Sequence, residues 1–285
     1  MQEYQQHCLC MRQIDRKGIN NMKIGFIGLG NMGSAMIGGI IKNHVTEKEN
    51  IFGADSFAAA QKKAKETFGI TILKTNEEVV KNADIIIFSV KPQFYESVIA
   101  GVKNVVSKDK IIVTIAPGKT LSWLAERFPA DTKIIRCMPN TPALVGEGCA
   151  GVCKNSFVSE DELSRVLDIL NSFGKAREVA EYMMDAVVSV SGSSPAYVFM
   201  MIEAMADGAV EAGMPRKDAY EFAAQAVYGS AKMVLETGKH PAELKDMVCS
   251  PAGTTIEAVR VLEEKGFRSS IIEAMHACTE KSRTM

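Results

Sequence analysis

The sequence predicts an α/β fold, a doubly wound sheet with helices on both faces, followed by an all-α C-terminal domain. Three observations predict it. From residue 22, short β-branched runs alternate with amphipathic stretches, the pattern of parallel βαβ units. A glycine-rich turn joins the first run to the next stretch. After about residue 180 strand signals stop, and long Ala- and Met-rich stretches follow. We therefore expect a sheet domain over residues 22–180 and a helical domain over residues 181–285.

Composition bounds the function of this chain of 285 residues. It is 47% hydrophobic with a formal net charge of -1, and no basic stripe stands out, which argues against a nucleic-acid partner. The longest apolar runs are far too short to cross a membrane. The seven cysteines have no paired spacing, and no histidine near Cys149 and Cys153 completes a metal site. We expect reduced thiols, no metal and a cytoplasmic protein.

Residues 1–21 are expected to be a disordered extension. They lack both regular periodicity and the apolar run of a secretory signal. Met22 opens the first strand run like a natural start. An upstream start codon or a disordered tail is therefore favoured over a functional segment.

The strands and helices of the first part follow from periodicity. The predicted strands are Lys23–Gly28, Ile51–Ala54, Ile70–Leu73, Asp84–Val90, Lys110–Ile115, Lys133–Cys137, Cys149–Cys153 and Lys175–Val179. The predicted helices are Met32–Asn43, Phe57–Phe68, Glu77–Asn82, Pro92–Val102, Leu121–Phe128 and Ser159–Phe173. Ser159 and Glu162 form a capping box at the start of the last helix.

The turn after the first strand has the sequence GLGNMG, over residues 28–33. Gly-x-Gly-x-x-Gly between a strand and a helix is the Rossmann-like fingerprint of dinucleotide binding. Gly28 permits the tight turn, Gly30 lets a pyrophosphate approach, and Gly33 lets helix and strand pack closely. The amides of Asn31 and Met32 begin the helix, whose N-terminus favours an anion.

The second strand ends at Asp55, where the adenosine ribose of a dinucleotide is expected. A carboxylate there favours NADH, because a 2′-phosphate would meet a like charge. Ser56, Lys62 and Lys63 follow, and they would accommodate that phosphate if the Asp55 side chain turned aside. The choice between NADPH and NADH therefore stays open.

Three further loops leave the carboxyl ends of predicted strands, the edge at which ligands bind in such sheets. The first two end in turns containing Lys91-Pro92 and Pro117. The third, Met138-Pro139-Asn140-Thr141-Pro142, is stiffened by its prolines. Asn140 and Thr141 are candidate substrate contacts, although a rigid connector explains the loop equally well.

The second part is predicted to be helical throughout. Its helices are Tyr182–Ala212 with an interruption near Gly192 to Pro195, Arg216–Glu236, a short one to about Val248, Ile256–Glu264 and Phe267–Arg283. Their apolar faces are expected to pack against one another, within or between chains, with the methionines as core filler.

One turn in this helical part has the sequence CSPAGTT, residues 249–255. Ser250, Gly253, Thr254 and Thr255 would combine converging amides with hydroxyls at a helix start, a site for a small carboxylate substrate. The alternative is a plain N-cap at Thr254 or Thr255. No histidine, cysteine or acidic pair has the spacing of acid–base or nucleophilic catalysis, so a nicotinamide cofactor must carry the chemistry.

Several motifs together make the chain resemble pyrroline-5-carboxylate reductase, the last enzyme of proline biosynthesis, over residues 22–285. These are IGFIGLGNMGSAM, FSVKPQ, RCMPNTPALVGEG, SGSSPAYVF, ADGAVEAGMPR and ETGKHPAELKDMVCSPAGTTIEAV, with Arg283 in the last helix. The family commonly has glycine at the positions of Ala252 and Ser194, and both replacements here are small.

The resemblance implies reduction of Δ1-pyrroline-5-carboxylate to L-proline by NADPH or NADH, in a homodimer or a larger ring of dimers. The implied cofactor contacts are Asn76 with the adenosine and, beside the nicotinamide, Val90, Lys91, Pro92, Ala116 and Pro117. Glu181, Thr254 and Thr255 would face the substrate. Thr255 is the expected hydrogen-bond partner of the ring nitrogen, and Glu181 the acidic group that favours its cation.

Two other functions compete with this one. A related imine or β-hydroxyacid reductase shares the architecture, but a hydroxyacid dehydrogenase needs a lysine on the helix after the domain junction, and residues 190–212 contain none. A non-catalytic dinucleotide-sensing protein would not need the CSPAGTT turn. A turnover assay separates these functions.

Overall fold

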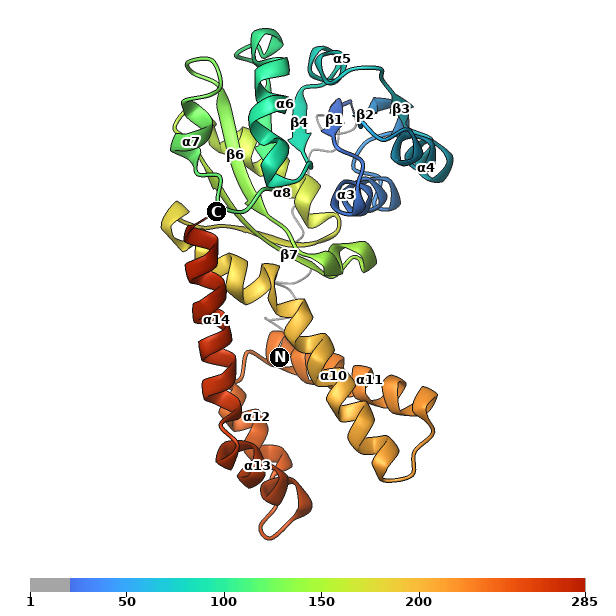
Figure 1. Cartoon of the computed structure of the whole chain (residues 1–285), viewed down its shortest axis with the longest axis vertical. Helices are drawn as coiled ribbons and strands as arrows, with labels where there is room; N and C mark the ends of the chain where they lie inside the picture. The colour runs from blue at the N-terminus through green and yellow to red at the C-terminus, as the bar shows by residue number, and fades with distance from the viewer. Residues whose placement is uncertain (1–20, 285) are drawn as a thin grey trace, which may run out of the picture. The chain divides into compact units, whose positions relative to one another are not determined.

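The computed structural model describes residues 21–284 (Figure 1). The extension predicted for residues 1–21 lies outside the described residues, except for Asn21. In the described part, a sheet with helices on both faces is followed by helices alone, as predicted.

Among the described residues, eight strands form one sheet in the order β3-β2-β1-β4-β5-β6-β7-β8. Their bounds are β1 Ile24–Ile27, β2 Ile51–Ala54, β3 Thr71–Ile72, β4 Ile85–Phe88, β5 Ile111–Thr114, β6 Lys133–Met138, β7 Gly148–Lys154 and β8 Gly174–Glu178. The chain adds strands on one side of β1 up to β3 and then returns to place β4 on the other side. The point between β1 and β4 is therefore the topological switch, where ligands bind in doubly wound sheets.

One strand pair departs from the predicted parallel pattern. β7 runs antiparallel to β6, and β8 is parallel to β7. The connection from β6 to β7 contains only a short 3-10 turn, Thr141–Val145. A parallel crossover needs a dozen or more residues, usually with a helix, so this loop can only return the chain in the opposite direction.

Two apolar layers cover the sheet, because successive residues of a strand point to opposite faces. On one face, Ile85 and Ile87 of β4 pack in a core with helices α3 (Asn31–Lys42), α4 (Ala58–Phe68) and α8 (Glu160–Asn171). On the other face, Ile86 and Phe88 pack with α5 (Asn76–Asn82), α6 (Tyr95–Val102) and α7 (Leu121–Ala125). Each fully buried side chain of this size contributes about 1.5–3 kcal/mol. The Ser159–Glu162 capping box begins α8 as predicted.

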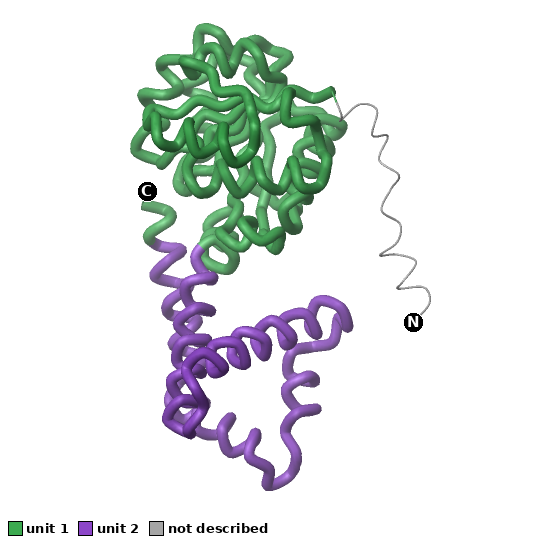
Figure 2. The backbone as a smooth tube through the Cα atoms, turned by 90° about the vertical axis from the view of Figure 1, so that its right-hand side faces the viewer, with its two compact units in different colours: residues 1–192, 281–285 green, residues 193–280 purple. Residues whose placement is uncertain are grey.

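The described residues fall into two compact units, coloured separately in Figure 2. Unit 1 holds residues 21–192 and 281–284, and unit 2 holds residues 193–280. In unit 1 the segment after β8 comprises a 3-10 turn (Glu181–Met183), α9 (Met184–Val187) and a π-helical turn (Val188–Gly192). The predicted long helix is thus interrupted at Val188–Gly192, which overlaps the predicted position only at Gly192. Residues 281–284 belong to unit 1, and the Ser282 hydroxyl there donates to Asp185 Oδ1 at 2.7 Å.

Unit 2 consists of helices α10 to α13 and most of α14. Their bounds are α10 Ser194–Glu211, α11 Arg216–Thr237, α12 Pro241–Val248, α13 Thr254–Glu264 and α14 Phe267–Arg283. Large apolar side chains of this unit remain exposed in the single chain, including Phe199, Met200, Phe222, Leu235 and Met247. Met200 and Met247 therefore do not fill a core within the single chain, whereas Met184, in unit 1, is buried.

Candidate active site

The glycine turn between β1 and α3 has the geometry that a dinucleotide needs. Gly28 has φ +100°, and a Cβ there would lie 2.8 Å from the Ser89 backbone. A Cβ on Gly33 would lie 2.6 Å from the Gly28 carbonyl oxygen. At Gly30, by contrast, an added Cβ would meet no atom within 4 Å. The first and third glycines are thus required by packing, whereas the second opens onto free space.

Helix α3 presents its N-terminus to that space. Gly30 is the N-cap residue, and no side chain caps the helix. The first amides of α3, those of Asn31, Met32 and Gly33, are therefore not taken by a capping side chain. Uncapped amides at the positive end of a helix are a binding site for a pyrophosphate. The residues present fit a dinucleotide.

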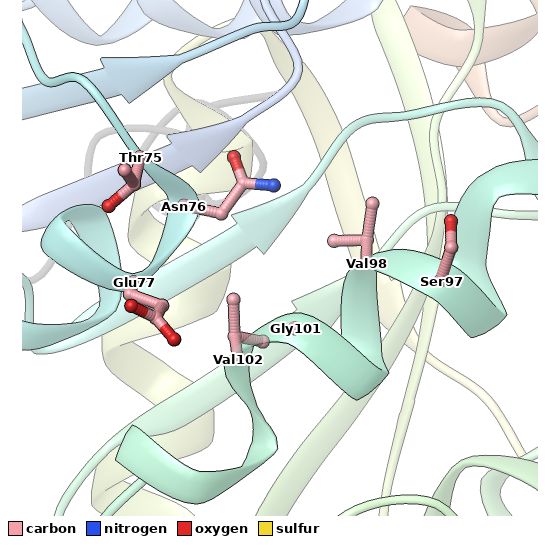
Figure 3. A pocket seen from close by; sticks show the side chains of 7 residues that line it. All are labelled: Thr75, Asn76, Glu77, Ser97, Val98, Gly101 and Val102. Atoms are coloured by element: carbon pink, nitrogen blue, oxygen red, sulfur yellow. The ribbon is translucent and has the colours of Figure 1, made fainter.

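A cavity of about 230 Å³ lies at the topological switch. It is lined by Ile27, Gly28, Ala54, Asp55, Ser56, Asn76, Val90, Phe94, Ser97 and Val98. A second cavity of about 420 Å³ shares Asn76, Ser97 and Val98 with the first and extends between α5 and α6. Figure 3 shows Asn76 facing Val98 of α6 across this cavity. Asn76 thus lines both cavities.

The loops after β4 and β5 leave the same edge of the sheet from neighbouring strands. Val90, Lys91 and Pro92 follow β4, and Ala116 and Pro117 follow β5. Tyr95 joins the two strand ends. Its buried hydroxyl donates to the Phe88 carbonyl at 2.6 Å and accepts from the Ile115 amide at 3.1 Å. Burial raises the pKa of Tyr95, so the hydroxyl stays protonated as a structural donor.

Asn140 is buried, and both ends of its amide are engaged within unit 1. Its Nδ2 donates to the Ser191 carbonyl at 3.0 Å, and its Oδ1 accepts from the Cys149 amide at 2.8 Å. The side chain therefore joins the start of β7 to the π-helical turn. Thr141, the next residue, is exposed at the start of the 3-10 turn.

Glu181 forms an ion pair with a buried arginine. Its Oε1 accepts from Arg136 Nη1 at 3.2 Å and from the Leu121 amide at 2.7 Å. The Arg136 side chain is only 5% exposed, whereas that of Glu181 is 36% exposed. The carboxylate therefore offsets a buried charge and binds the first amide of α7.

The buried thiols of the sheet offer no nucleophile. Cys137 and Cys153 are buried in β6 and β7. Burial raises the pKa of Cys137, and it raises that of Cys153 to about 12. Both thiols are therefore protonated near neutral pH and chemically inert.

In unit 2, the CSPAGTT segment forms a tight turn into α13. The Gly253 amide donates to the Ser250 carbonyl at 3.0 Å, and Ala252 has φ +54°, in the left-handed region. A Cβ on Gly253 would lie 2.3 Å from the Ser250 hydroxyl oxygen. A side chain at 253 would therefore displace the Ser250 hydroxyl and crowd its carbonyl oxygen, at 3.1 Å.

The alternative of a plain N-cap at Thr254 or Thr255 is wrong in this structure. The N-cap residue of α13 is Gly253, and no side chain caps the helix. Thr254 and Thr255 are the first two helical residues, with Thr254 exposed and Thr255 half-buried. Their hydroxyls are therefore not needed to begin the helix, and the first amides of α13 are free of a capping side chain.

The predicted site residues fall into two groups. The cofactor candidates, with Asn140, Thr141 and Glu181, belong to unit 1, and Ser250, Gly253, Thr254 and Thr255 belong to unit 2. Sequence reasoning did not single out Ser89, Arg136, Phe94, Ser97 or Val98. Phe94 carried no distinct signal in the sequence, because single apolar residues are common on protein surfaces.

Comparison with known proteins gives two family models and many relatives. Residues 181–285 match the model described as pyrroline-5-carboxylate reductase dimerisation, and residues 23–118 match NADP oxidoreductase, coenzyme F420-dependent. The pyrroline-5-carboxylate reductase of Escherichia coli is 54% identical over 267 residues, covering 92% of this chain and 98% of the relative. That of Arabidopsis thaliana is 41% identical, covering 93% and 96%.

The chain is also similar to solved structures of proteins that carry this reductase name. The crystal structure of Plasmodium falciparum pyrroline carboxylate reductase with NADP bound is 35% identical, with a TM-score of 0.86 over 94% of this chain and 99% of that one. The Coxiella burnetii pyrroline-5-carboxylate reductase is 30% identical with a TM-score of 0.86, covering 93% and 98%.

Proposed function

The chain belongs to the pyrroline-5-carboxylate reductase family, and on that premise we propose that it reduces Δ1-pyrroline-5-carboxylate to L-proline with NADPH or NADH, the last step of proline biosynthesis. The observation that carries this proposal is the uncapped turn of residues 250–255, since its threonines are not needed to begin α13. Relatives that bear the reductase name match this chain over nearly its whole length.

Unit 1 would hold the dinucleotide at the switch between β1 and β4. Bound NADPH or NADH would supply the hydride. The α3 amides would bind its pyrophosphate above Gly30, where the protein leaves open space. Asn76 would contact the adenosine. Val90, Lys91, Pro92, Ala116 and Pro117 would orient the nicotinamide beside the strand ends.

Unit 2 would bind the substrate through the turn before α13. The amides at the start of α13 suit a carboxylate, because the helix N-terminus carries a partial positive charge. The Thr255 hydroxyl oxygen would accept a hydrogen bond from the protonated ring nitrogen. Ser250, Gly253 and Thr254 would form the rest of the substrate site. A protonated imine accepts a hydride at its C=N carbon, C2 of the pyrroline ring, and its nitrogen keeps the proton in the amine product. Positioning two rings in this way supplies about 7–11 kcal/mol in favourable cases.

Glu181 would stabilise the cationic form of the substrate less than a lone carboxylate would. Its partner Arg136 offsets its charge, so the pair stabilises an iminium less than an unpaired acid. Asn140 and Thr141 remain proposed contacts, with the Asn140 amide already engaged by Ser191 and Cys149. We therefore assign the main hydrogen bond to Thr255.

We further propose that the protein is a homodimer or a larger ring of dimers. The family model over residues 181–285 describes dimerisation. The exposed apolar side chains of unit 2 are what a second copy would cover. Light scattering on the purified protein gives the assembly mass, and a monomer at micromolar concentration contradicts the proposal.

We also propose a cytoplasmic protein built as a sheet domain over residues 22–180 and a helical domain over residues 181–285. The cysteines among residues 21–284 are free thiols, which suits a reducing compartment. Within the same residues, no helix has the length and apolar character needed to cross a membrane.

Oxidation of NADPH and NADH, followed with pyrroline-5-carboxylate and with a panel of other cyclic imines and keto acids, tests the function. The proposal expects pyrroline-5-carboxylate to give the highest kcat/KM. The substrate assignment is refuted if kcat/KM is higher for another imine. It is also refuted if kcat/KM is higher for oxidation of a β-hydroxyacid or for reduction of the corresponding keto acid. Dinucleotide binding without any turnover identifies a sensing protein instead.

A further inference from the structure

The peptide bond between Gly28 and Leu29 is held from both sides by side chains. The Leu29 amide donates to Asp55 Oδ2 at 2.7 Å. The Gly28 carbonyl, on the same peptide, accepts from the Ser89 hydroxyl at 2.7 Å. Asp55 follows β2 and Ser89 follows β4, the two strands that flank β1. One peptide of the glycine turn is thus fixed by residues from both neighbouring strands.

Backbone contacts complete this arrangement. The Gly28 amide donates to the Ala54 carbonyl at 2.8 Å, and the Ser89 amide donates to the Ile27 carbonyl at 2.9 Å. A Cβ on Gly33 would touch both the Gly28 carbonyl oxygen, at 2.6 Å, and the Ser89 hydroxyl oxygen, at 3.0 Å. The carbonyl therefore lies between the serine hydroxyl and the first turn of α3.

Both oxygens of the Asp55 carboxylate are engaged by the protein. While Oδ2 accepts from Leu29, Oδ1 accepts from the Phe57 amide at 2.9 Å. The acidic residue of this fingerprint hydrogen-bonds the ribose 2′-hydroxyl of a bound NAD. Here the two oxygens are directed at amides of two different segments, before α3 and before α4.

We propose that Asp55 and Ser89 act together as positioning residues that orient the glycine turn for the pyrophosphate, and that Asp55 does not select between NADH and NADPH. This inference rests on the proposed use of a dinucleotide. The peptide that they hold directly precedes Gly30 and the first amides of α3, so its rotation would turn those amides away from the ligand. Misplacement of binding groups by about 1 Å is enough to cost binding and rate.

The test compares four variants with the wild type: Asp55→Ala, Ser89→Ala, the double variant, and Asp84→Ala as control. Asp84 is a matched control, because its carboxylate also accepts from a backbone amide, that of Lys23 at 3.1 Å, and it precedes β4, at the opposite edge of the sheet. Dissociation constants for NADPH and NADH, measured by fluorescence titration without substrate, are the main readout. Steady-state kinetics with both cofactors give KM and kcat separately.

We expect Asp55→Ala to weaken both cofactors by about tenfold, and Ser89→Ala by about fivefold, with the NADPH to NADH preference unchanged within about twofold. The fold loss of cofactor affinity in the double variant should be smaller than the product of the losses in the two single variants, because both residues hold one peptide. At saturating cofactor kcat should stay near wild type, and Asp84→Ala should bind both cofactors normally.

Two results overturn the inference. One is a loss by Asp55→Ala that falls on NADH alone and changes the cofactor preference more than tenfold, since that marks a ribose contact. The other is unchanged binding of both cofactors by Asp55→Ala and Ser89→Ala. If Asp55→Ala does not fold, Asp55→Asn and Ser89→Ala are judged by the same criteria. Wild-type protein that binds dinucleotide but does not reduce pyrroline-5-carboxylate refutes the proposed function and leaves this test valid, whereas a wild type that binds no dinucleotide refutes both.

Discussion

Arg136 of β6 and Glu181, the first residue of the turn after β8, form an ion pair with 3.2 Å between Nη1 and Oε1. The pair joins a central strand of the sheet to the segment that leads out of it. Since the arginine is buried, removing its partner leaves a buried charge without compensation.

Glu181→Gln should therefore lower the free energy of unfolding by about 1–3 kcal/mol, because the neutral amide no longer offsets Arg136. Urea denaturation measures the loss. Glu126→Gln is the matched control, since Glu126 pairs with Arg127 at 3.4 Å but is largely exposed, and it should cost less than about 0.5 kcal/mol. Equal losses in the two variants would contradict a special role for the Arg136 pair.

Gly30→Val should raise the KM for the dinucleotide at least about tenfold without lowering the unfolding midpoint. The reason is that the added side chain would enter open space in the protein and occupy the place of the pyrophosphate. Gly33→Ala provides the contrast, because its Cβ would meet the Gly28 carbonyl oxygen at 2.6 Å and should destabilise the fold. A folded Gly30→Val protein with wild-type cofactor affinity would show that the pyrophosphate lies elsewhere.

Thr255→Ala should lower kcat/KM for pyrroline-5-carboxylate about tenfold to hundredfold, the cost of one hydrogen bond to a charged partner. Cofactor affinity should stay the same. Because Gly253 is the N-cap residue, the unfolding midpoint should not fall. Normal kinetics in this variant would remove Thr255 from the substrate site.

Acid should destabilise the protein partly through Glu162. Although burial alone would raise its pKa, hydrogen bonds from Lys133 and Ser159 hold the pKa below the ordinary value of 4.5. A carboxyl with a depressed folded-state pKa stabilises the fold above its unfolded pKa, and that stabilisation is lost as the pH falls through the folded pKa. Glu162→Gln should therefore weaken the fall in stability below about pH 4.5. Denaturation curves from pH 3 to pH 7 measure this, and an identical fall in both proteins would contradict it.

Ala252→Gly should stabilise the protein by about 0.5–1 kcal/mol. Alanine in the left-handed region costs about 1–2 kcal/mol, of which the greater freedom of unfolded glycine offsets part. Thermal unfolding monitored by circular dichroism is the measurement. A lowered midpoint would mean that the turn does not keep φ +54° at this position in solution.

Periodicity was enough to predict the strands of the sheet and the order of the helices. The central strands are nearly continuous apolar runs, such as Ile85–Phe88, and these are distinctive of a sheet covered on both faces. The antiparallel β7 was missed, because its direction depends on the length of one loop and not on the composition of the strand. In that loop, the proline spacing around Asn140 marked rigidity and carried no information about which groups its amide would meet.

The sequence predicted the backbone turns of the candidate site, but it did not predict which side chains contact one another. Glycine spacing locates a turn, since only glycine fits at positions such as Gly28. The contacts of Ser89 and Asp55 with one peptide join residues that are 34 positions apart, and nothing in their local sequence marks the pairing. The same holds for Arg136 and Glu181, which are separated along the chain by β7 and β8.

The uncovered apolar side chains of unit 2 bear on how the protein folds in a cell. If another copy covers Phe199, Phe222 and Leu235, part of the folding free energy is supplied by association and depends on protein concentration. The melting temperature should then rise with concentration. Newly synthesised chains would expose these apolar side chains until they associate with a second copy. At low concentration of the protein, binding by chaperones or proteolysis would therefore be favoured.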